Sequence, residues 1–417
     1  MLGCDEDGHD HDAQSSVVHE SVASPLLTKA HDVLFVCGAN SHGQCGTSSQ
    51  RKVSTVQALR LTSGLRVLRV ACGAAHSALV TQDGLLFMWG ANRWGQLGVG
   101  STENHARPMR VDALEHVMDV ACGAQHTLAL THAARTYAWG AAGHGQLGIG
   151  AALAAPVKKP TLVPKLASVK CRQVSAGGLH SAALTAAGLV YTWGWGRLGQ
   201  LGQKATSMYE EPTPVEIPCA VVKIKCGGNH TLALSSTGEC YAWGAGSHGQ
   251  TASASRQHRR QPRQVIISDD NGEPLADASL IVDIDAGLLH TTLLTSGGDV
   301  YACGTAEDGE LGAGVDVMNE AQVNGAGPVR PVRVLYDRER AGGAPLKYIA
   351  CGSWHTLAIN SAGAAFAWGY GADGRLGLGK DCGDAVPVPQ QVTALAGVRI
   401  DDVAAGGAHS IFVARRN

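Results

Sequence analysis

The stretch VACGAQHTLALTHAARTYAWGAAGHGQLGIG, from Val120 to Gly150, recurs with variations along a chain of 417 residues. A complete copy contains a small residue and Gly, two variable positions, His, a hydroxyl residue, an apolar run, a turn, an aromatic segment that ends in Gly and a Gly-rich loop. The histidines that mark the seven copies are His76, His126, His180, His230, His290, His355 and His409. They lie 50, 54, 50, 60, 65 and 54 residues apart, and periods of this length predict a solenoid or a propeller.

Each copy is expected to contain two neighbouring strands. Large and small side chains alternate in residues 126–130 and again in residues 137–140, which is the period of two that strands have. The turn between the two segments contains Gly in several copies, as in Gln82-Asp83-Gly84, and Gly favours tight hairpins. A unit of this size cannot bury both of its faces, so neighbouring units must stack.

The two ends of the chain are complementary. The last copy, residues 403–413, lacks the turn, the aromatic-Gly segment and the Gly-rich loop. Residues 31–38 and the loop 42–46 supply these parts from the other end. We therefore predict an all-β, closed seven-bladed β-propeller of about 50–65-residue repeats, with one blade shared between the N- and C-termini. Such a ring leaves no exposed sheet edge between its first and last units.

This order of motifs resembles the family named for the regulator of chromosome condensation, over about residues 31–417. The resemblance implies a seven-bladed β-propeller. It does not select a function, because the family includes exchange factors for the Ran GTPase, a plant UV-B photoreceptor and propellers that only dock partners.

Residues 1–30 lack the repeat and begin MLGCDEDGHDHD, with acidic residues and no basic ones. They lack the basic start and apolar core of a signal peptide. We expect a disordered acidic tail, the alternative being weak chelation of a divalent metal by His9 and His11. The propeller is expected to span residues 31–417, with inserts at about 251–280 and 315–346.

The overall charge excludes some partners. Lys and Arg total 33 against 35 Asp and Glu, a net charge of −2, so there is no global attraction to nucleic acid or to anionic membranes. The sequence also has no apolar run of about 18 residues that would span a bilayer. We expect a protein partner, with no direct nucleic-acid or membrane binding.

The repeated cysteines and histidines are interpreted as structural. Cys72, Cys122, Cys226 and Cys351 share one repeat position where other copies have Ala, and no Cys-x-x-Cys occurs. Reduced cysteines indicate an intracellular protein, cytoplasmic or nuclear or both. The seven repeat histidines have the same neighbours in every copy, whereas a catalytic group needs distinct ones. We therefore expect no catalytic residue, no bound metal and no cofactor.

Function is expected where the copies differ. In the Gly-x-x-x-x-Gly loops the residue before the second Gly changes from copy to copy, and aromatic and Arg side chains on loops are typical of binding hot spots. The first insert adds Arg259 and Arg260, which either bind an acidic partner or belong to a solvent-exposed loop. For Trp94 and Trp195, simple coverage of a blade end remains an open alternative. The candidate partner-binding residues are Arg93, Trp94, Trp195, Arg197, Arg259, Arg260, Asp308, Trp354, Tyr370, Asp373 and Arg375.

We predict a non-catalytic protein-interaction propeller that docks a protein partner through its blade-specific loops. The first alternative is a guanine nucleotide exchange factor for a Ran-like small GTPase. That function is expected to need a β-wedge after an aromatic-Gly strand, yet every such loop keeps its four-residue spacing. A remote alternative is a UV-B photoreceptor-like protein, which depends on clustered tryptophans at Gly-Trp-Arg-His-Thr sites. Only Trp354 stands near such a site in this sequence, and no Arg accompanies it.

Overall fold

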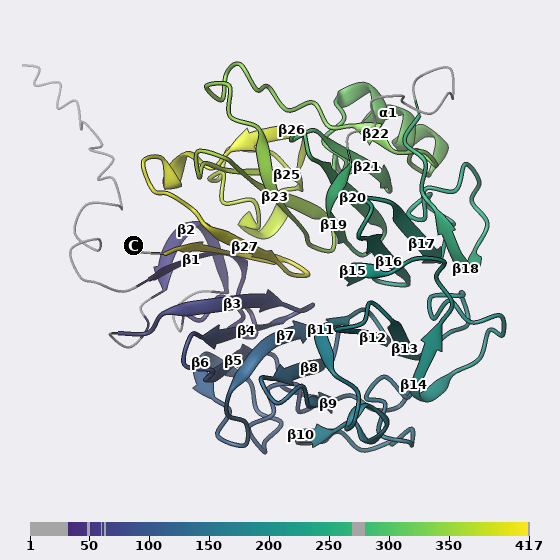
Figure 1. Ribbon diagram of the computed structural model, residues 1–417. Helices are drawn as coiled ribbons and strands as arrows, with labels where there is room; N and C mark the ends of the chain where they lie inside the picture. The colour runs from purple at the N-terminus through teal and green to yellow at the C-terminus, as the bar shows by residue number, and fades with distance from the viewer. Residues whose placement is uncertain (1–31, 48–50, 60, 62–63, 269–279, 416–417) are drawn as a thin grey trace, which may run out of the picture.

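The computed structural model describes residues 32–47, 51–59, 61, 64–268 and 280–415, so the predicted acidic tail and part of the first insert lie outside the described residues. Seven four-stranded antiparallel sheets are arranged as blades around a central axis (Figure 1). The seven-bladed, nearly all-β architecture predicted from the repeats is confirmed.

Six blades are built from consecutive strands, which follow one another from the axis outward. Blade I contains β3 (Val67–Cys72), β4 (His76–Thr81), β5 (Leu86–Gly90) and β6 (His105–Arg110). Blade II contains β7 (Val117–Cys122), β8 (His126–Thr131), β9 (Thr136–Gly140) and β10 (Val157–Leu162). Blade III contains β11 (Cys171–Ala176), β12 (His180–Thr185), β13 (Val190–Gly194) and β14 (Tyr209–Val215).

The remaining consecutive blades follow the same order. Blade IV contains β15 (Val221–Cys226), β16 (His230–Ser235), β17 (Cys240–Gly244) and β18 (Arg259–Gln264). Blade V contains β19 (Ile281–Ala286), β20 (His290–Thr295), β21 (Val300–Gly304) and β22 (Val332–Arg333). Blade VI contains β23 (Leu346–Cys351), β24 (His355–Asn360), β25 (Ala365–Tyr370) and β26 (Ala385–Gln391).

Blade VII combines strands from both ends of the described chain. Its order from the axis is β27 (Asp402–Ala405), β28 (His409–Ala414), β1 (Val33–Ala39) and β2 (Lys52–Leu59). Strands β1 and β28 are antiparallel, with Val33 opposite Ala414 and Gly38 opposite His409. The N-terminal strand β1 therefore pairs with a strand that is separated from it by most of the sequence.

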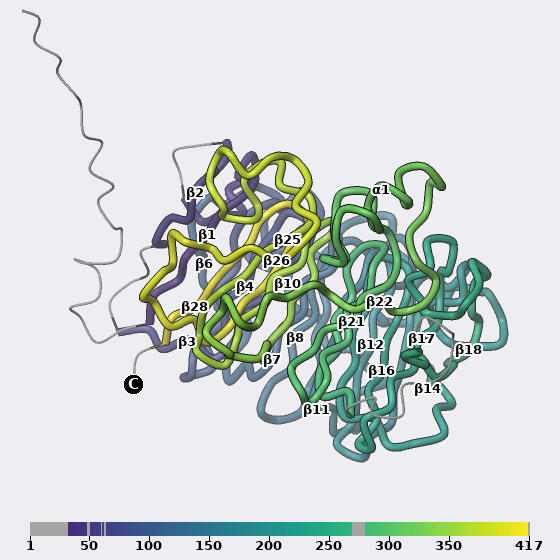
Figure 2. The backbone as a smooth tube through the Cα atoms, turned by 90° about the horizontal axis from the view of Figure 1, so that it is seen from above, coloured from purple at the N-terminus to yellow at the C-terminus, as the bar shows by residue number. Residues whose placement is uncertain are grey.

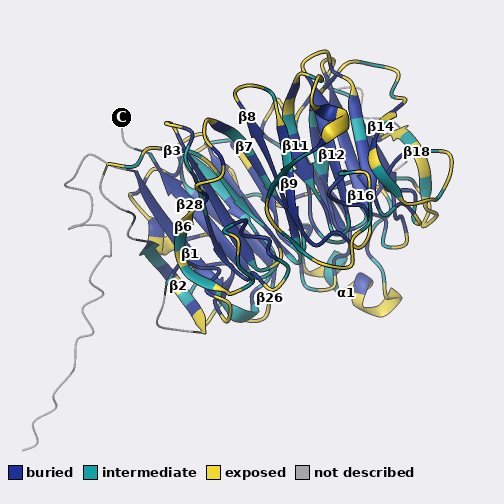
Figure 3. Ribbon diagram, turned by 90° about the horizontal axis from the view of Figure 1, so that it is seen from below, coloured by how far each residue is buried: buried dark blue, intermediate teal, exposed yellow. Residues whose placement is uncertain are grey.

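The ring has two faces. We call the loop face the one that carries the Gly-x-x-His hairpins and the connections between third and fourth strands, and the turn face the opposite one. The connection from β21 to β22 on the loop face holds α1 (Val315–Asn324), which lies outside the sheets at the periphery (Figures 2 and 3). Three short 3-10 helices, η2 (Pro164–Leu166), η3 (Ala372–Gly374) and η4 (Thr393–Leu395), complete the elements. No helix in the described ranges is long and apolar enough to cross a membrane.

A ring of hydrogen bonds joins every blade to the next. The Nε2 atom of each repeat histidine lies 2.8–3.1 Å from the hydroxyl of Ser or Thr in the following blade. That hydroxyl donates to a loop carbonyl of the preceding blade at 2.7–3.0 Å. The seventh link runs from His409 to Ser77 in blade I, so the set of contacts is circular.

These contacts define the state of the buried imidazoles. Because each hydroxyl has a single hydrogen and donates it to the carbonyl, it accepts from the histidine, which fixes the Nε2–H tautomer. Burial lowers the pKa of His126 to about 4 and that of His230 to about 3, so these rings are neutral at physiological pH. In blades I, II, III and VI, the Trp of the third strand donates its indole N–H to the same loop carbonyl, as Trp139 does to Gln96 at 2.8 Å.

Candidate partner-binding surface

The loops that follow the third strands share one frame in six blades. The side chain of a buried Gln, or of Glu310 in blade V, accepts the backbone N–H of the residue two positions earlier at 2.8–3.0 Å. In most of these loops the second Gly packs on the outer strand of the next blade, while Gly249 packs on the connection that precedes β22. At Gly95 a Cβ atom would lie 2.9 Å from the Cα of Lys158, so only Gly fits. The frame therefore sets each variable side chain beside the next blade.

The side chains before the second Gly of these loops vary around the ring. The residue before the second Gly is His42, Trp94, His144, Leu198, His248, Asp308 and Asp373 in turn, and each is at least partly exposed. Figure 3 shows that exposure concentrates in the connections and outer strands, whereas the second strand of each blade, such as β8, is buried along its whole length. The loop face thus combines a rigid backbone with a chemically varied surface.

The structure divides the predicted contact residues into three groups. Arg93 and Trp94 belong to blade I, where the guanidinium lies 5.7 Å from the centre of the Trp94 ring. Trp195 and Arg197 belong to the blade III loop, which packs on Arg259 and Arg260 of β18. The third group lies on blades V and VI and consists of Asp308, Trp354, Tyr370, Asp373 and Arg375.

Arg375 differs from its expected role as a contact residue. It is only 4% exposed, and its guanidinium lies 4.8 Å from the Tyr370 ring. Its Nη1 donates to the carbonyl of Gly407 at 3.1 Å, and its Nη2 lies 3.3 Å from Asp373. Burial lowers the pKa of Arg375. The side chain occupies the buried position that Gln has in other blades, so it holds blades VI and VII together and cannot itself reach a partner.

Glu310 is a residue that sequence reasoning missed. It stands where five other loops have Gln, and its carboxyl is completely buried. Its Oε2 accepts from the N–H of Asp308 at 3.0 Å, while its Oε1 has no hydrogen-bond partner. Burial raises the pKa of Glu310 to about 7. The available signal was Gly-Glu-Leu-Gly in place of Gly-Gln-Leu-Gly.

Replacing this carboxyl by the usual amide should stabilise the protein at high pH. The folded-state pKa of Glu310 lies above its ordinary value of 4.5, so its stabilising contribution is present below about pH 4.5 and is lost as the pH rises through about 7. We expect Glu310→Gln to raise the free energy of unfolding by roughly 1–3 kcal/mol at pH 8 and to have little effect near pH 5. Urea unfolding at both pH values measures this difference.

The reciprocal change provides the control. Gln250 is the fully buried counterpart in blade IV. Gln250→Glu should destabilise the protein at pH 8 by a similar amount and with the opposite sign. A Glu310→Gln effect that did not change between pH 5 and pH 8 would contradict a neutral, protonated Glu310 at low pH.

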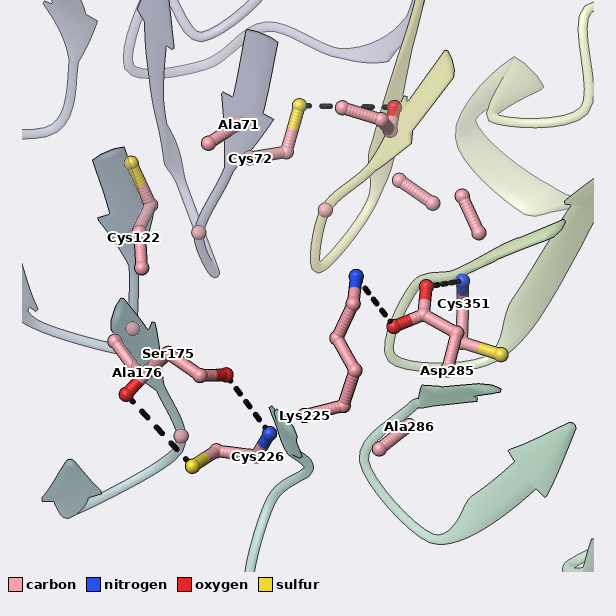
Figure 4. A pocket seen from close by; sticks show the side chains of 18 of the residues that line it. Ala71, Cys72, Cys122, Ser175, Ala176, Lys225, Cys226, Asp285, Ala286 and Cys351 are labelled. Carbon is pink, nitrogen blue, oxygen red and sulfur yellow. Dashed lines mark hydrogen bonds and ion pairs between the residues drawn. The ribbon is translucent and has the colours of Figure 1, made fainter. Parts of the chain in front are cut away.

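A central channel of about 660 Å³ runs between the innermost strands. Its wall carries charges that the sequence analysis did not identify, including Lys225 and Asp285, which lie 2.9 Å apart across blades IV and V (Figure 4). Lys223 and Asp283 form a second ion pair between the same blades. These four charges pair with one another, whereas Arg69 and Arg172, which also line the channel, form no ion pair in the described part of the chain.

The channel also contains the repeated thiols. Cys72, Cys122, Cys226 and Cys351 line its wall together with Ala residues, as Figure 4 shows. Burial raises the pKa of the Cys226 thiol to about 12 and that of the Cys351 thiol well above its ordinary value, so these groups are protonated and unreactive. Within the described ranges, no three His, Cys, Asp or Glu side chains are grouped to hold a metal ion.

Comparison with known families matches residues 34–412 to the RCC1-like domain. The chain is 29% identical over 349 residues to the ultraviolet-B receptor UVR8 of Arabidopsis thaliana, covering 83% of this chain and 63% of that protein. It is 31% identical over 388 residues to the E3 ubiquitin-protein ligase HERC2 of Homo sapiens, covering 91% of this chain and 8% of that protein. Over 350 residues it is 31% identical to the human X-linked retinitis pigmentosa GTPase regulator, covering 83% of this chain and 32% of that protein. The chain thus spans less than two thirds of the length of these relatives.

Solved structures are similar in fold. Yeast Prp20p superimposes on this chain with a TM-score of 0.80 at 24% identity, and the match covers 94% of this chain and 92% of the Prp20p chain. That structure is described together with the binding of Prp20p to Gsp1p and histones. Human WBSCR16 also gives a TM-score of 0.80 at 24% identity, with 92% of this chain and 99% of that one covered. At this level of identity the likeness concerns the fold alone.

Proposed function

Because the chain belongs to the RCC1-like domain family, we propose that it is a docking propeller, a non-catalytic ring whose loop face binds a protein partner. The observation that carries this proposal is the combination of one repeated loop frame with outward side chains that vary between blades, including His, Trp, Leu and Asp. A rigid frame lowers the entropic cost of binding, and varied side chains provide specificity.

The Arg93–Trp94 pair is the proposed centre of this surface. Trp94 is partly exposed, stacks with Arg93 and stands on a loop that packs against the cationic outer strand of blade II. Tryptophan and arginine are the side chains most enriched among energetically dominant contacts of interfaces. The proposal also places the protein inside the cell, since the eleven described cysteines are all unpaired.

A second candidate is guanine nucleotide exchange on a Ran-like small GTPase. The long connection with α1 on the loop face favours it, because an exchange factor must insert material beside the nucleotide. The binding of Prp20p to Gsp1p and the description of another relative as a GTPase regulator also point in this direction. A protein of this kind would lower nucleotide affinity without covalent chemistry.

One experiment separates the two functions. Partners are captured with the wild-type protein, with Trp94→Ala and with the control His144→Ala, which changes the equivalent position of blade II. We expect a partner that wild type and control retain, and that Trp94→Ala binds at least about 30-fold more weakly, the effect of losing about 2 kcal/mol. Equal retention by all three proteins would contradict the proposed surface.

The same proteins are then mixed with Ran loaded with labelled GDP. A docking propeller leaves GDP release unchanged, whereas an exchange factor accelerates it at substoichiometric concentration, because it binds the nucleotide-free GTPase more tightly. Acceleration that is lost on removal of residues 315–324 would establish the exchange function in place of docking.

A further inference from the structure

The outer edge of blade IV carries an unusual density of positive charge. Strand β18 (Arg259–Gln264) has the sequence RRQPRQ. Further arginines come from the connection before β18, from the blade III loop and from the connection before β22. We call this surface the arginine rim. It consists of Arg197, Arg256, Arg259, Arg260, Arg263 and Arg330.

Specific contacts bring these segments together from three blades. The blade III loop packs directly on β18, since a Cβ atom at Gly199 would lie 2.9 Å from the Cα of Arg260. On the other side, the N–H of Ala254 donates to the carbonyl of Val329 at 3.2 Å. Arg256 Nη2 donates to the carbonyl of Gly327 at 3.2 Å. The rim is therefore a continuous surface and not a run of charge on a free loop.

The positive charge of the rim is not compensated within the described structure. Its six arginines form no ion pair there, and the carboxylate of Glu239 accepts instead from Gln264 and Thr237. Arg259 is half-buried and its Nη1 has no hydrogen-bond partner. Burial and the nearby charge of Arg263 lower the pKa of Arg259. A half-buried guanidinium that has one buried nitrogen without a hydrogen-bond partner and lies beside a like charge would be stabilised by an anion.

The shape of the rim favours an extended anion. Arg259, Arg260 and Arg263 follow one another along this irregular edge strand, with Arg259 opposite Gly244 and Arg263 opposite Ala242, so an extended anion can meet several arginines in succession. Strand β18 is also the last strand of its sheet, so a chain can lie along its outer side. Residues 245–265 contain no Phe, Tyr or Trp, and the neighbouring blade III loop contributes one aromatic side chain, Trp195, near these arginines. A site for single-stranded nucleic acid would alternate aromatic and basic side chains, and β18 does not.

We propose that the arginine rim binds an extended acidic segment of a partner protein along β18. Carboxylates of the segment pair with Arg260 and Arg263 on the exposed side, and the half-buried Arg259 provides the contact from which water is most excluded. This inference rests on the proposed docking function and adds the chemical class of the partner and a second site on the ring.

The test uses a fluorescein-labelled poly-glutamate peptide and the full chain. We expect it to bind the wild-type protein, with an affinity that falls as salt is raised. Arg260→Glu with Arg263→Glu should weaken binding at least about tenfold, because two attractive contacts become repulsive. The matched control is Arg107→Glu with Arg110→Glu on β6, the outer strand of blade I, which changes the net charge equally. It should bind like wild type, and the melting temperatures of all three should agree.

The alternative outcomes are distinct. Equal weakening by both double variants would overturn the site and leave only a general charge effect. Tighter binding of poly-uridylate than of poly-glutamate, lost in the rim variant, would replace the acidic segment by nucleic acid.

The Trp94→Ala variant separates the rim from the proposed loop-face function. Poly-glutamate binding should be unaffected by Trp94→Ala. If the peptide does not bind while partner capture still depends on Trp94, the rim inference is wrong and the docking function stands. If the peptide binds and Trp94→Ala retains the partner, the proposed loop-face function fails alone.

Discussion

Deletion of residues 403–417 should abolish the cooperative unfolding transition of the propeller. The deletion removes β28 and most of β27, which are two of the four strands of blade VII. Strand β1 then loses every pairing with β28 from Val33 to Gly38, and the buried Leu34 and Val36 become accessible to water. The circular set of hydrogen bonds between the blades is also interrupted, because the hydroxyl of Ser410 and the imidazole of His409 are lost. An unpaired apolar edge strand promotes aggregation.

Circular dichroism during heating, combined with light scattering, measures this outcome. The control is deletion of residues 1–25, which lie outside the described residues and were predicted from composition to form a tail without a core. That deletion should leave the melting temperature unchanged. A normal transition after deletion of residues 403–417 would contradict a blade shared between the two ends of the chain.

The second and third strands of each blade could be predicted from the sequence because their environment is uniform. Strand β8 is buried at all six positions and carries the repeated His and hydroxyl residue, so its pattern recurs with every blade. Strand β9 ends in Trp139-Gly140 and recurs likewise. Seven copies of the same local pattern reinforce one another, and the incomplete copies at the two ends predicted how the ring closes.

The first and fourth strands were not predicted, for opposite physical reasons. Strand β7 borders a polar channel, so Asp119 stands among apolar residues and the alternation is obscured. Strand β10 lies at the edge of its sheet, is polar and contains Pro160, which is a residue expected to interrupt a strand except at an edge. The distance of a strand from the axis of the ring decides both patterns, and the local sequence does not state that distance.

Helix α1 was missed because its sequence is weakly amphipathic and only Ala321 is buried. One signal was present, since Gly325 adopts the left-handed conformation that ends helices.

Comparing the copies identified the predicted contact residues, but it could not show which of them are buried. The exposed Arg197 and the buried Arg375 therefore looked equivalent in the sequence. The pairing of Lys225 with Asp285 was not visible either, because the other copies at this position have Ala or Ser.

Asp285→Ala should lower the free energy of unfolding by about 3–4 kcal/mol, the largest loss expected from one substitution in the channel. Asp285 is 7% exposed and joins three blades. Its Oδ1 lies 2.9 Å from Lys225 Nζ in blade IV, and its Oδ2 accepts the N–H of Cys351 in blade VI at 2.7 Å. Truncation leaves a largely enclosed ammonium without its counter-charge and a buried N–H without an acceptor. Urea unfolding at pH 7 measures the loss.

Two further variants divide this loss into its parts. Ser175 occupies the equivalent position in blade III, where its hydroxyl accepts the N–H of Cys226 at 2.9 Å. Asp285→Ser should therefore restore the acceptor for Cys351 but not the ion pair, and should recover about 1 kcal/mol of the loss. Adding Lys225→Met to Asp285→Ala removes the unpaired charge and should recover most of the remainder, because a buried ion pair contributes little beyond what an apolar replacement provides. A loss below about 1 kcal/mol for Asp285→Ala alone would mean that water in the channel solvates Lys225, and that the ion pairs do not hold blades IV, V and VI together.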